Sequence, residues 1–143
     1  MGFEIHILDI SRVSDQKIVC GLTEYYLDQI PRVTFYLKSM IESWRLMKFR
    51  IESARYFNID NFRDFVSQTV IHEHRHVQQF MFLKYLGGDE FLEFMLTRLM
   101  QIDYDESPIE IDAYRYQLDS GRSIMEILND PIILNLIHEF ETL

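Results

Sequence analysis

The sequence predicts an α+β domain in which helices dominate and a small sheet is formed near the amino end. Three observations lead to this class. Long stretches of the second half repeat apolar residues every three or four positions, whereas short stretches of the first half alternate apolar and polar residues. Apolar residues make up 48% of the 143 residues, which is enough for a buried core. Five Gly and three Pro leave little room for long loops, so we expect one domain over 1–143.

Two strands and one helix are expected in the first half. Residues 3–10 alternate apolar and polar side chains, which predicts a short strand. From Pro31 the apolar residues recur at three and four positions, which predicts a helix with proline in its first turn. Residues 47–57 alternate again, which predicts a strand with one face buried.

The second half is predicted to be helical, because residues typical of helix ends punctuate it. Ser107-Pro108 and Asp130-Pro131 are typical helix starts, and Gly87-Gly88 and Gly121 are typical ends. The predicted helices run from a turn at 58–60 capped by Asp60 to about Leu86, over 89–102, from Pro108 to Gly121, and over 131–141.

Charge and composition exclude several classes of function. Fourteen basic and twenty-three acidic residues give a net charge of −9, which argues against sequence-independent binding of nucleic acid. Residues 89–143 carry three basic and thirteen acidic residues, so we expect an acidic face there. No apolar run is long enough for a membrane helix, and the first residues do not resemble a secretory signal. A single cysteine, Cys20, is typical of a reducing compartment, so we expect a cytoplasmic protein without membrane or nucleic-acid partners.

The segment with the clearest chemical meaning is His72-Glu73-x-x-His76, the H-E-x-x-H pattern of zinc peptidases. Positions four apart on a helix return to within about 40° of each other, one turn along. Two imidazoles at this spacing can bind one ion, and Glu73 points to the same side. Taken as a helix, the segment places all three residues among the apolar ones. His74, Arg75 and other polar residues fall on the opposite side, which we expect to face solvent; they include Asp64, Ser67 and Gln78.

A glutamate on the buried face is costly unless charge or hydrogen bonds compensate it, and a divalent cation does so. Two interpretations follow. His72, Glu73 and His76 form a metal site, or they are hydrogen-bonded polar residues of the core. We favour the first for this pair of histidines with an enclosed glutamate. His6 and His138 are isolated and are interpreted as ordinary histidines.

A catalytic zinc site usually has three protein ligands and a water. Positions 79 and 82 are Gln and Phe, so no third histidine follows in the H-x-x-G-x-x-H extension and a carboxylate is expected. Glu110, near the start of a predicted helix, shares its side with Ala113, whereas Asp112 lies about 200° away. Glu110 is therefore the candidate ligand. Ser107-x-x-Glu110 is also a capping box, in which the glutamate only satisfies a backbone N–H.

The combination of His72-Glu73-x-x-His76-x-x-Gln79 with Pro108-x-Glu110-x-x-Ala113 resembles the gluzincin class of zincin metallopeptidases, and in particular the small forms called minigluzincins. The resemblance covers about 60–118. It implies a zincin-like domain with a small sheet packed on the H-E-x-x-H helix. It further implies that Zn²⁺ is bound by His72, His76 and Glu110.

The resemblance also implies that Glu73 is the general base and that the substrate is a peptide or protein. Larger gluzincins often have an acidic residue four positions after the glutamate ligand, where this chain has Tyr114. A donor to the oxyanion is also needed, and the sequence does not choose among the candidates Tyr104, Tyr114, Arg115 and Tyr116. The predicted strand at 47–57 is a candidate for binding extended peptide by edge addition.

Two other functions compete with the peptidase. A di-iron carboxylate protein would need a second Glu-x-x-His pair, and the sequence has none. A non-catalytic zinc-binding or protein-interaction domain related to peptidases is the stronger alternative, with the acidic segment as its contact surface. The segment 1–30 or the last helix is also a candidate for covering the cleft.

Overall fold

The computed structural model describes residues 2–26, 29–47, 61–118 and 123–143. The chain divides into two compact units, Met1–His74 and Arg75–Leu143, whose boundary falls inside one long helix. The expected α+β class with dominant helices is confirmed. The single domain over 1–143 stays a prediction. Within the described ranges, no helix combines the length and the apolar character that crossing a membrane requires.

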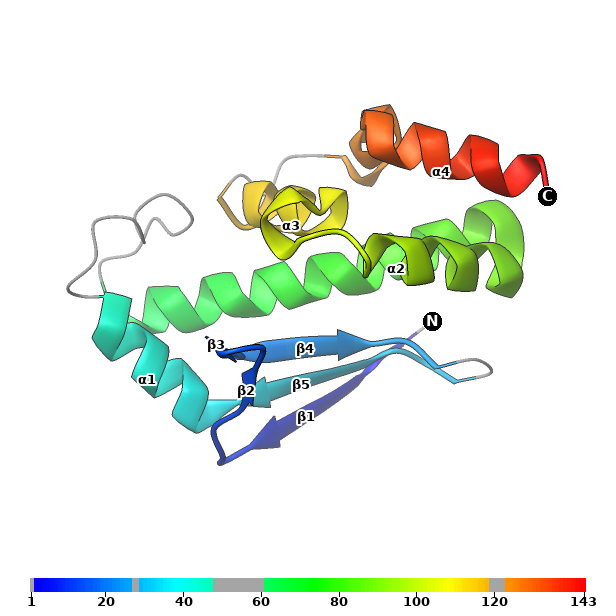
Figure 1. Ribbon diagram of the computed structural model, residues 1–143. Coiled ribbons are helices and arrows are strands. Elements are labelled where there is room, and N and C mark those ends of the chain that lie inside the picture. Colours follow the sequence, from blue (N-terminus) through cyan, green and yellow to red (C-terminus); the bar gives the residue numbers. More distant parts are fainter. Residues whose placement is uncertain (1, 27–28, 48–60, 119–122) are drawn as a thin grey trace. The chain divides into compact units, whose positions relative to one another are not determined.

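A three-stranded mixed sheet forms the centre of the first unit (Figure 1). Its strand order is β1 (Glu4–Leu8), β5 (Arg32–Tyr36) and β4 (Gly21–Glu24). β5 pairs in parallel with β1 and antiparallel with β4. The middle strand supplies much of the core, since its last four residues are all buried. Because β4 is the last strand in this order, it is an outer strand of the sheet.

The predicted helix from Pro31 is wrong in its first part. Residues 32–36 form β5, and the helix α1 (Leu37–Met47) begins only after them. These residues are rich in β-branched and aromatic side chains, which favour strands. Because a middle strand can be buried on both faces, it lacks the alternation that identifies a half-buried strand. Its apolar run therefore merged with the apolar face of α1.

The strand predicted at 3–10 is confirmed by β1. The sequence did not reveal β4 or the small hairpin of β2 (Val13–Ser14) and β3 (Lys17–Ile18). Asp15 and Gln16 connect this hairpin with φ of 49° and 64°, the type I′ arrangement that usually contains glycine. Without a glycine, the turn left no signal in the sequence.

Part of the predicted middle segment lies outside the described residues. This is true of residues 48–57 of the predicted strand, of the turn at 58–60 and of its cap Asp60. The one described residue of that strand, Met47, is the last residue of α1 instead. Asn61 accepts a hydrogen bond from the backbone N–H of Asp64 at 2.9 Å, so this asparagine caps the next helix.

The long helix α2 (Phe62–Leu99) is two helices joined at a kink. The kink is at Gly88, whose φ of 81° and ψ of −171° are not helical. A residue with a side chain adopts this φ only with strain, so glycine is needed where the first helix ends. The predicted end at Gly87-Gly88 and the predicted second helix are therefore both confirmed.

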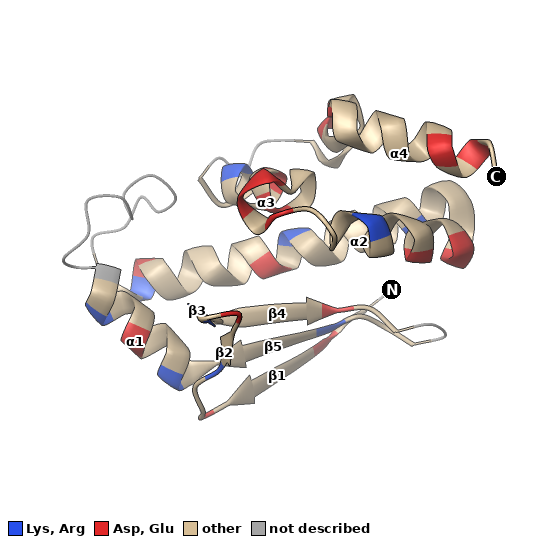
Figure 2. Cartoon of the chain, in the orientation of Figure 1, with Lys and Arg blue, Asp and Glu red and all other residues tan. Residues whose placement is uncertain are grey.

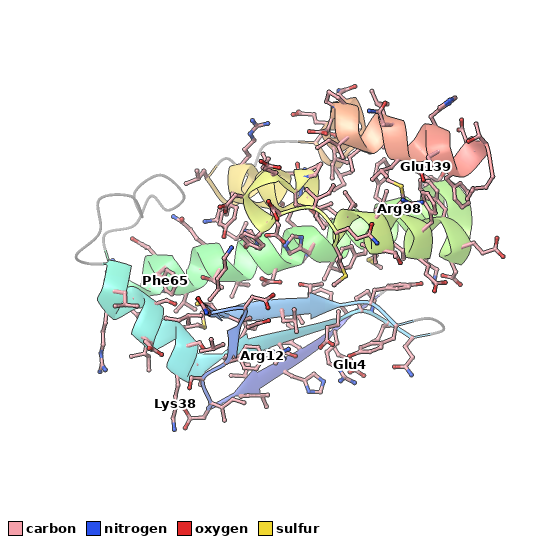
Figure 3. The ribbon with its side chains drawn as sticks, in the orientation of Figure 1. Glu4, Arg12, Lys38, Phe65, Arg98 and Glu139 are labelled. Atoms are coloured by element: carbon pink, nitrogen blue, oxygen red, sulfur yellow. The ribbon has the colours of Figure 1, made fainter. Side chains whose placement is uncertain are left out.

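The second unit adds shorter helices to the carboxyl part of α2. They are η2 (Tyr104–Glu106), α3 (Pro108–Leu118), η3 (Ile124–Asn129) and α4 (Pro131–Glu141). The predicted starts at Pro108 and Asp130-Pro131 are confirmed, and Asp130 caps α4 by accepting from Ile132 N at 2.9 Å. Gly121 lies outside the described residues. Figure 3 shows Arg98 of α2 beside Glu139 of α4, an ion pair of 2.6 Å.

The two units differ in charge as the sequence indicates. Asp and Glu recur on α3, on the carboxyl part of α2 and at the end of α4, as the red segments of Figure 2 show. Whether these residues form a contact face stays a prediction.

Candidate metal centre

The three residues of the H-E-x-x-H pattern face inward on α2. His72, Glu73 and His76 are 5%, 7% and 5% exposed, which confirms the burial expected from the helical arithmetic. One ligand atom from each lies within 4.8 Å of the others. They belong to successive turns of one helix, so the helix itself sets this spacing. The cluster has a size and composition that suit a metal ion.

Glu73 lies against strand β4 within the first unit. The Thr23 hydroxyl donates to Glu73 Oε2 at 2.5 Å and lies 3.2 Å from the Glu73 carbonyl oxygen. Gly21 makes the second contact, because a Cβ built on it would be 2.8 Å from Glu73 Cγ. A real Cβ does not approach this closely, so glycine is what allows the strand to lie beside this side chain.

Both nitrogens of the His76 ring have close partners within the second unit. Nδ1 lies 2.8 Å from Gln79 Oε1, and Nε2 lies 2.8 Å from Glu110 Oε1. The Glu110 side chain comes from the first turn of α3 and is 15% exposed. The predicted third ligand is thus in contact with one of the predicted histidine ligands. Its role as a ligand stays a prediction.

The donor atoms of the three proposed ligands are of the types that zinc sites use. Catalytic zinc is bound by imidazole nitrogens and carboxylate oxygens, and His72, His76 and Glu110 offer these atom types. The two histidines are almost completely buried, which suits an ion whose ligands come mostly from the protein. The His76–Glu110 pair places two different donors in direct contact. The atom types that these residues offer therefore fit a zinc ion.

Tyr104 interacts with Glu110 and with a second tyrosine, Tyr114. The hydroxyls of Tyr104 and Tyr114 are 2.8 Å apart. Burial around its hydroxyl, followed by the negative charge of Glu110, raises the pKa of Tyr104 well above its usual range, so this phenol keeps its proton and remains a donor. Of the other candidate donors, Tyr116 has its ring under the Arg75 guanidinium at 4.3 Å, and Arg115 is exposed.

The expectation that Arg75 faces solvent is wrong, and Asp112, placed about 200° from Glu110 on its predicted helix, is buried as well. They are 2% and 7% exposed and form an ion pair in which Arg75 Nε is 2.7 Å from Oδ2 and Nη2 is 3.1 Å from Oδ1. A helical wheel assigns polar residues to solvent, but two charged residues from different helices can bury each other. The partners are 37 positions apart, so neither helix alone indicates the pair.

His74 is not part of the cluster, as the sequence predicted. Its ring is partly buried, and its centroid lies 5.8 Å from that of Phe3. His74 is therefore less exposed than the sequence predicted. His6 pairs with Glu4 at 3.2 Å on the surface, far along the chain from the motif.

Comparisons with protein-family models, with curated proteins and with solved structures produced no match. The site is therefore interpreted from its own residues.

Proposed function

We propose that this protein is a zinc-dependent peptidase. His72, His76 and Glu110 hold the ion, and Glu73 is the general base. The observation that carries the proposal is the buried cluster of His72, Glu73 and His76 on one helix. The 2.8 Å contact of His76 with Glu110 supports it from a second helix. A buried glutamate beside two buried histidines needs compensating charge, and a divalent cation supplies it.

Each residue has a distinct task in the proposed hydrolysis. Zinc, when bound, acts as a Lewis acid toward the scissile carbonyl and lowers the pKa of water. Glu73 accepts a proton as the water oxygen attacks the carbonyl carbon, and returns it to the nitrogen as the C–N bond breaks. The products are a carboxylate and an amine. Because the Thr23 hydroxyl occupies Oε2 of Glu73, Oε1 is the oxygen that we assign to the proton.

Strand β4 is the part of the structure best suited to orient a peptide. In the described part of the chain it pairs only with β5, which leaves its second edge for an added strand. Thr23 lies on β4 and contacts Glu73, so an extended peptide on this edge would pass the proposed base. The predicted strand at 47–57 lies outside the described residues, except Met47, and stays an untested alternative.

Stabilisation of the oxyanion is assigned to the pair Tyr104 and Tyr114. Their hydroxyls contact each other, and the raised pKa of Tyr104 keeps it a hydrogen-bond donor near neutral pH. A neutral phenol can donate to a developing negative charge without being ionised itself. Replacement of each tyrosine by Phe should lower the turnover number more than zinc affinity, and equal loss of both would contradict the assignment.

Metal content is the first test. Elemental analysis of the untagged protein should find about one zinc per chain in the wild type and none in His72→Ala. His74→Ala is the matched control, because this histidine lies on the same helix outside the cluster. Absence of zinc in the wild type, with no uptake of added zinc at neutral pH, would return the three residues to being polar core residues.

The third ligand has its own test. Glu110→Ala should bind zinc more weakly than the wild type in competition with a chelator, because one of three protein ligands is lost. Glu106→Ala is the control, since this exposed glutamate belongs to the neighbouring turn η2. Equal stoichiometry and equal affinity in Glu110→Ala would limit Glu110 to its capping role.

A second candidate is a zinc-binding protein without catalysis. The contacts of Glu73 favour it, because the Thr23 hydroxyl and the close approach of Gly21 hold the carboxylate as a buried structural group. In this case the function would survive Glu73→Gln but not the loss of His72. In a peptidase Glu73→Gln removes turnover and retains the metal.

A further inference from the structure

His76 is connected to a buried ion pair through one side chain, Gln79. This glutamine is fully buried, and both polar atoms of its side chain have partners. Its Nε2 donates to Asp112 Oδ2 at 2.7 Å and to the Ile109 carbonyl at 2.9 Å. Its Oε1 lies 2.8 Å from His76 Nδ1. His76 and Gln79 lie on α2, and Ile109 and Asp112 lie on α3, all within the second unit.

These contacts determine which way the amide points. The Ile109 carbonyl can only accept a hydrogen bond, and the Asp112 carboxylate, which receives Arg75 from the other side, also accepts. The group that faces both must be the NH₂ of Gln79. Its oxygen therefore faces His76, and the opposite orientation would place an acceptor against two acceptors in a buried site.

The orientation of the amide in turn decides the proton on His76. A carbonyl oxygen at 2.8 Å from Nδ1 requires that Nδ1 carry the proton and donate it. The other ring nitrogen, Nε2, faces Glu110 Oε1 at 2.8 Å, and its lone pair is available to an ion that takes the place of a proton there. A metal ligand needs that lone pair.

Arg75 makes the arrangement rigid. It is 2% exposed and binds both oxygens of Asp112 while its Nη2 also donates to the Ser123 carbonyl at 3.1 Å. Its guanidinium lies over the Tyr116 ring at 4.3 Å. Bidentate geometry leaves the carboxylate little freedom to rotate. Asp112 thus presents Oδ2 to Gln79 in one direction only.

We propose that Gln79 is a positioning residue that Asp112 and the Ile109 carbonyl orient so that His76 is held in the Nδ1–H tautomer, with Nε2 directed to the metal. The part of this inference that concerns the metal rests on the proposed zinc site. The proton on Nδ1 does not require the ion, because the Gln79 oxygen accepts a hydrogen bond from it in either case. Partners that orient a ligand histidine typically contribute about 10- to 100-fold to metal affinity, and we expect an effect of this size from Gln79.

The first experiment observes the tautomer in the metal-free full-length protein. Long-range ¹H–¹⁵N spectra show which ring nitrogens carry protons, and His76→Gln assigns the signal. We expect a proton on Nδ1 of His76 in the wild type and an Nε2–H tautomer in Gln79→Met, which has a similar shape but leaves the Glu110 carboxylate as an acceptor for the ring. A wild type in which Nδ1 of His76 carries no proton would overturn the inference.

The second experiment measures zinc affinity by competition with a chelator. Gln79→Met should bind zinc about 10- to 100-fold more weakly than the wild type. The matched control is Gln78→Met, because this neighbouring glutamine contacts Arg75 Nη1 at 3.2 Å and not His76. Affinity in Gln79→Met within twofold of the control would overturn the positioning role, and circular dichroism shows that both variants are folded.

The two experiments separate this inference from the proposed function. A wild type that binds no zinc contradicts the peptidase proposal, while its tautomer still decides the orientation of Gln79. A wild type that binds zinc with His76 in the Nε2–H tautomer leaves the zinc site standing and refutes the role of Gln79.

Discussion

Glu73 and His76 are three positions apart on one helix, yet the structure holds them in very different ways. Glu73 has a neutral hydroxyl from Thr23 and the close backbone of Gly21. His76 has a buried amide that is itself oriented by a buried ion pair. One contact is a single rotatable O–H group, and the other is a network in which every member is satisfied.

This difference corresponds to the two proposed tasks. A metal ligand benefits from a fixed ring orientation and a fixed tautomer, which a rigid network provides. A general base must accept a proton and then release it, so its partner has to tolerate both states. The Thr23 hydroxyl can rotate and either donate or accept. The contact of Glu73 with Thr23 therefore permits proton exchange, whereas the contact of His76 with Gln79 restricts rotation of the imidazole ring.

The largest effect is expected from Glu73→Gln. Hydrolysis of a peptide substrate should fall by about 10²- to 10⁴-fold, because the amide cannot accept the proton of the attacking water. Zinc content should remain that of the wild type, since the three proposed ligands are intact. Turnover and elemental analysis on the same sample measure both. Unchanged turnover would remove the contrast between base and ligand and favour the non-catalytic protein.

The next effect concerns the ion pair behind His76. Arg75→Met or Asp112→Leu alone should lower the free energy of unfolding by about 3–5 kcal/mol, because each leaves an uncompensated charge in the interior. The double variant should lose less than either single one. Urea denaturation of the four proteins measures this cycle. Losses that simply add in the double variant would show that the pair does not act as a unit.

A smaller effect is expected at the strand that contacts Glu73. Gly21→Ala introduces a Cβ 2.8 Å from Glu73 Cγ, so the strand or the side chain must move. We expect the free energy of unfolding to fall by about 1–3 kcal/mol, as in other overpacked positions. Gly2→Ala is the control, since a Cβ there meets nothing within 4 Å. Equal stability of the two variants would mean that β4 or the Glu73 side chain shifts at little cost in free energy.

The smallest effect is expected at Cys20, which reports on the charge of Glu73. Burial, and to a lesser degree the Glu73 carboxylate, raises the pKa of this thiol, although a hydrogen bond to Ser43 opposes the shift. A raised folded-state pKa contributes stability that is complete below the pKa of the unfolded thiol and is lost as pH rises through the folded value. Alkylation by iodoacetamide at about pH 8 should therefore be slower than for an unfolded thiol.

Glu73→Gln should make Cys20 alkylation modestly faster, because one of the causes of the raised pKa is removed. The rate in denaturant provides the reference for an unperturbed thiol. Alkylation in the native protein as fast as in denaturant would show that the thiol is not buried as the structure has it.

Much of the fold was predictable where chain-local chemistry decides it. The helix ends at Gly88 and the start at Asp130-Pro131 depend on backbone conformations that only certain residues favour, so they could be located from the sequence. The middle strand β5 was missed because burial on both faces erased its alternation. The turn at Asp15-Gln16 was missed because it has no glycine.

For the candidate site, the sequence by itself determined the cluster of His72, Glu73 and His76, because the pitch of a helix brings these spacings together in any fold. It also singled out Glu110 as the candidate third ligand. Only the tertiary structure decided which groups surround them. Thr23 is 50 positions from Glu73, and Gln79 is 33 from Asp112. Contacts between residues so far apart depend on how helices and strands pack, and no local periodicity encodes that packing.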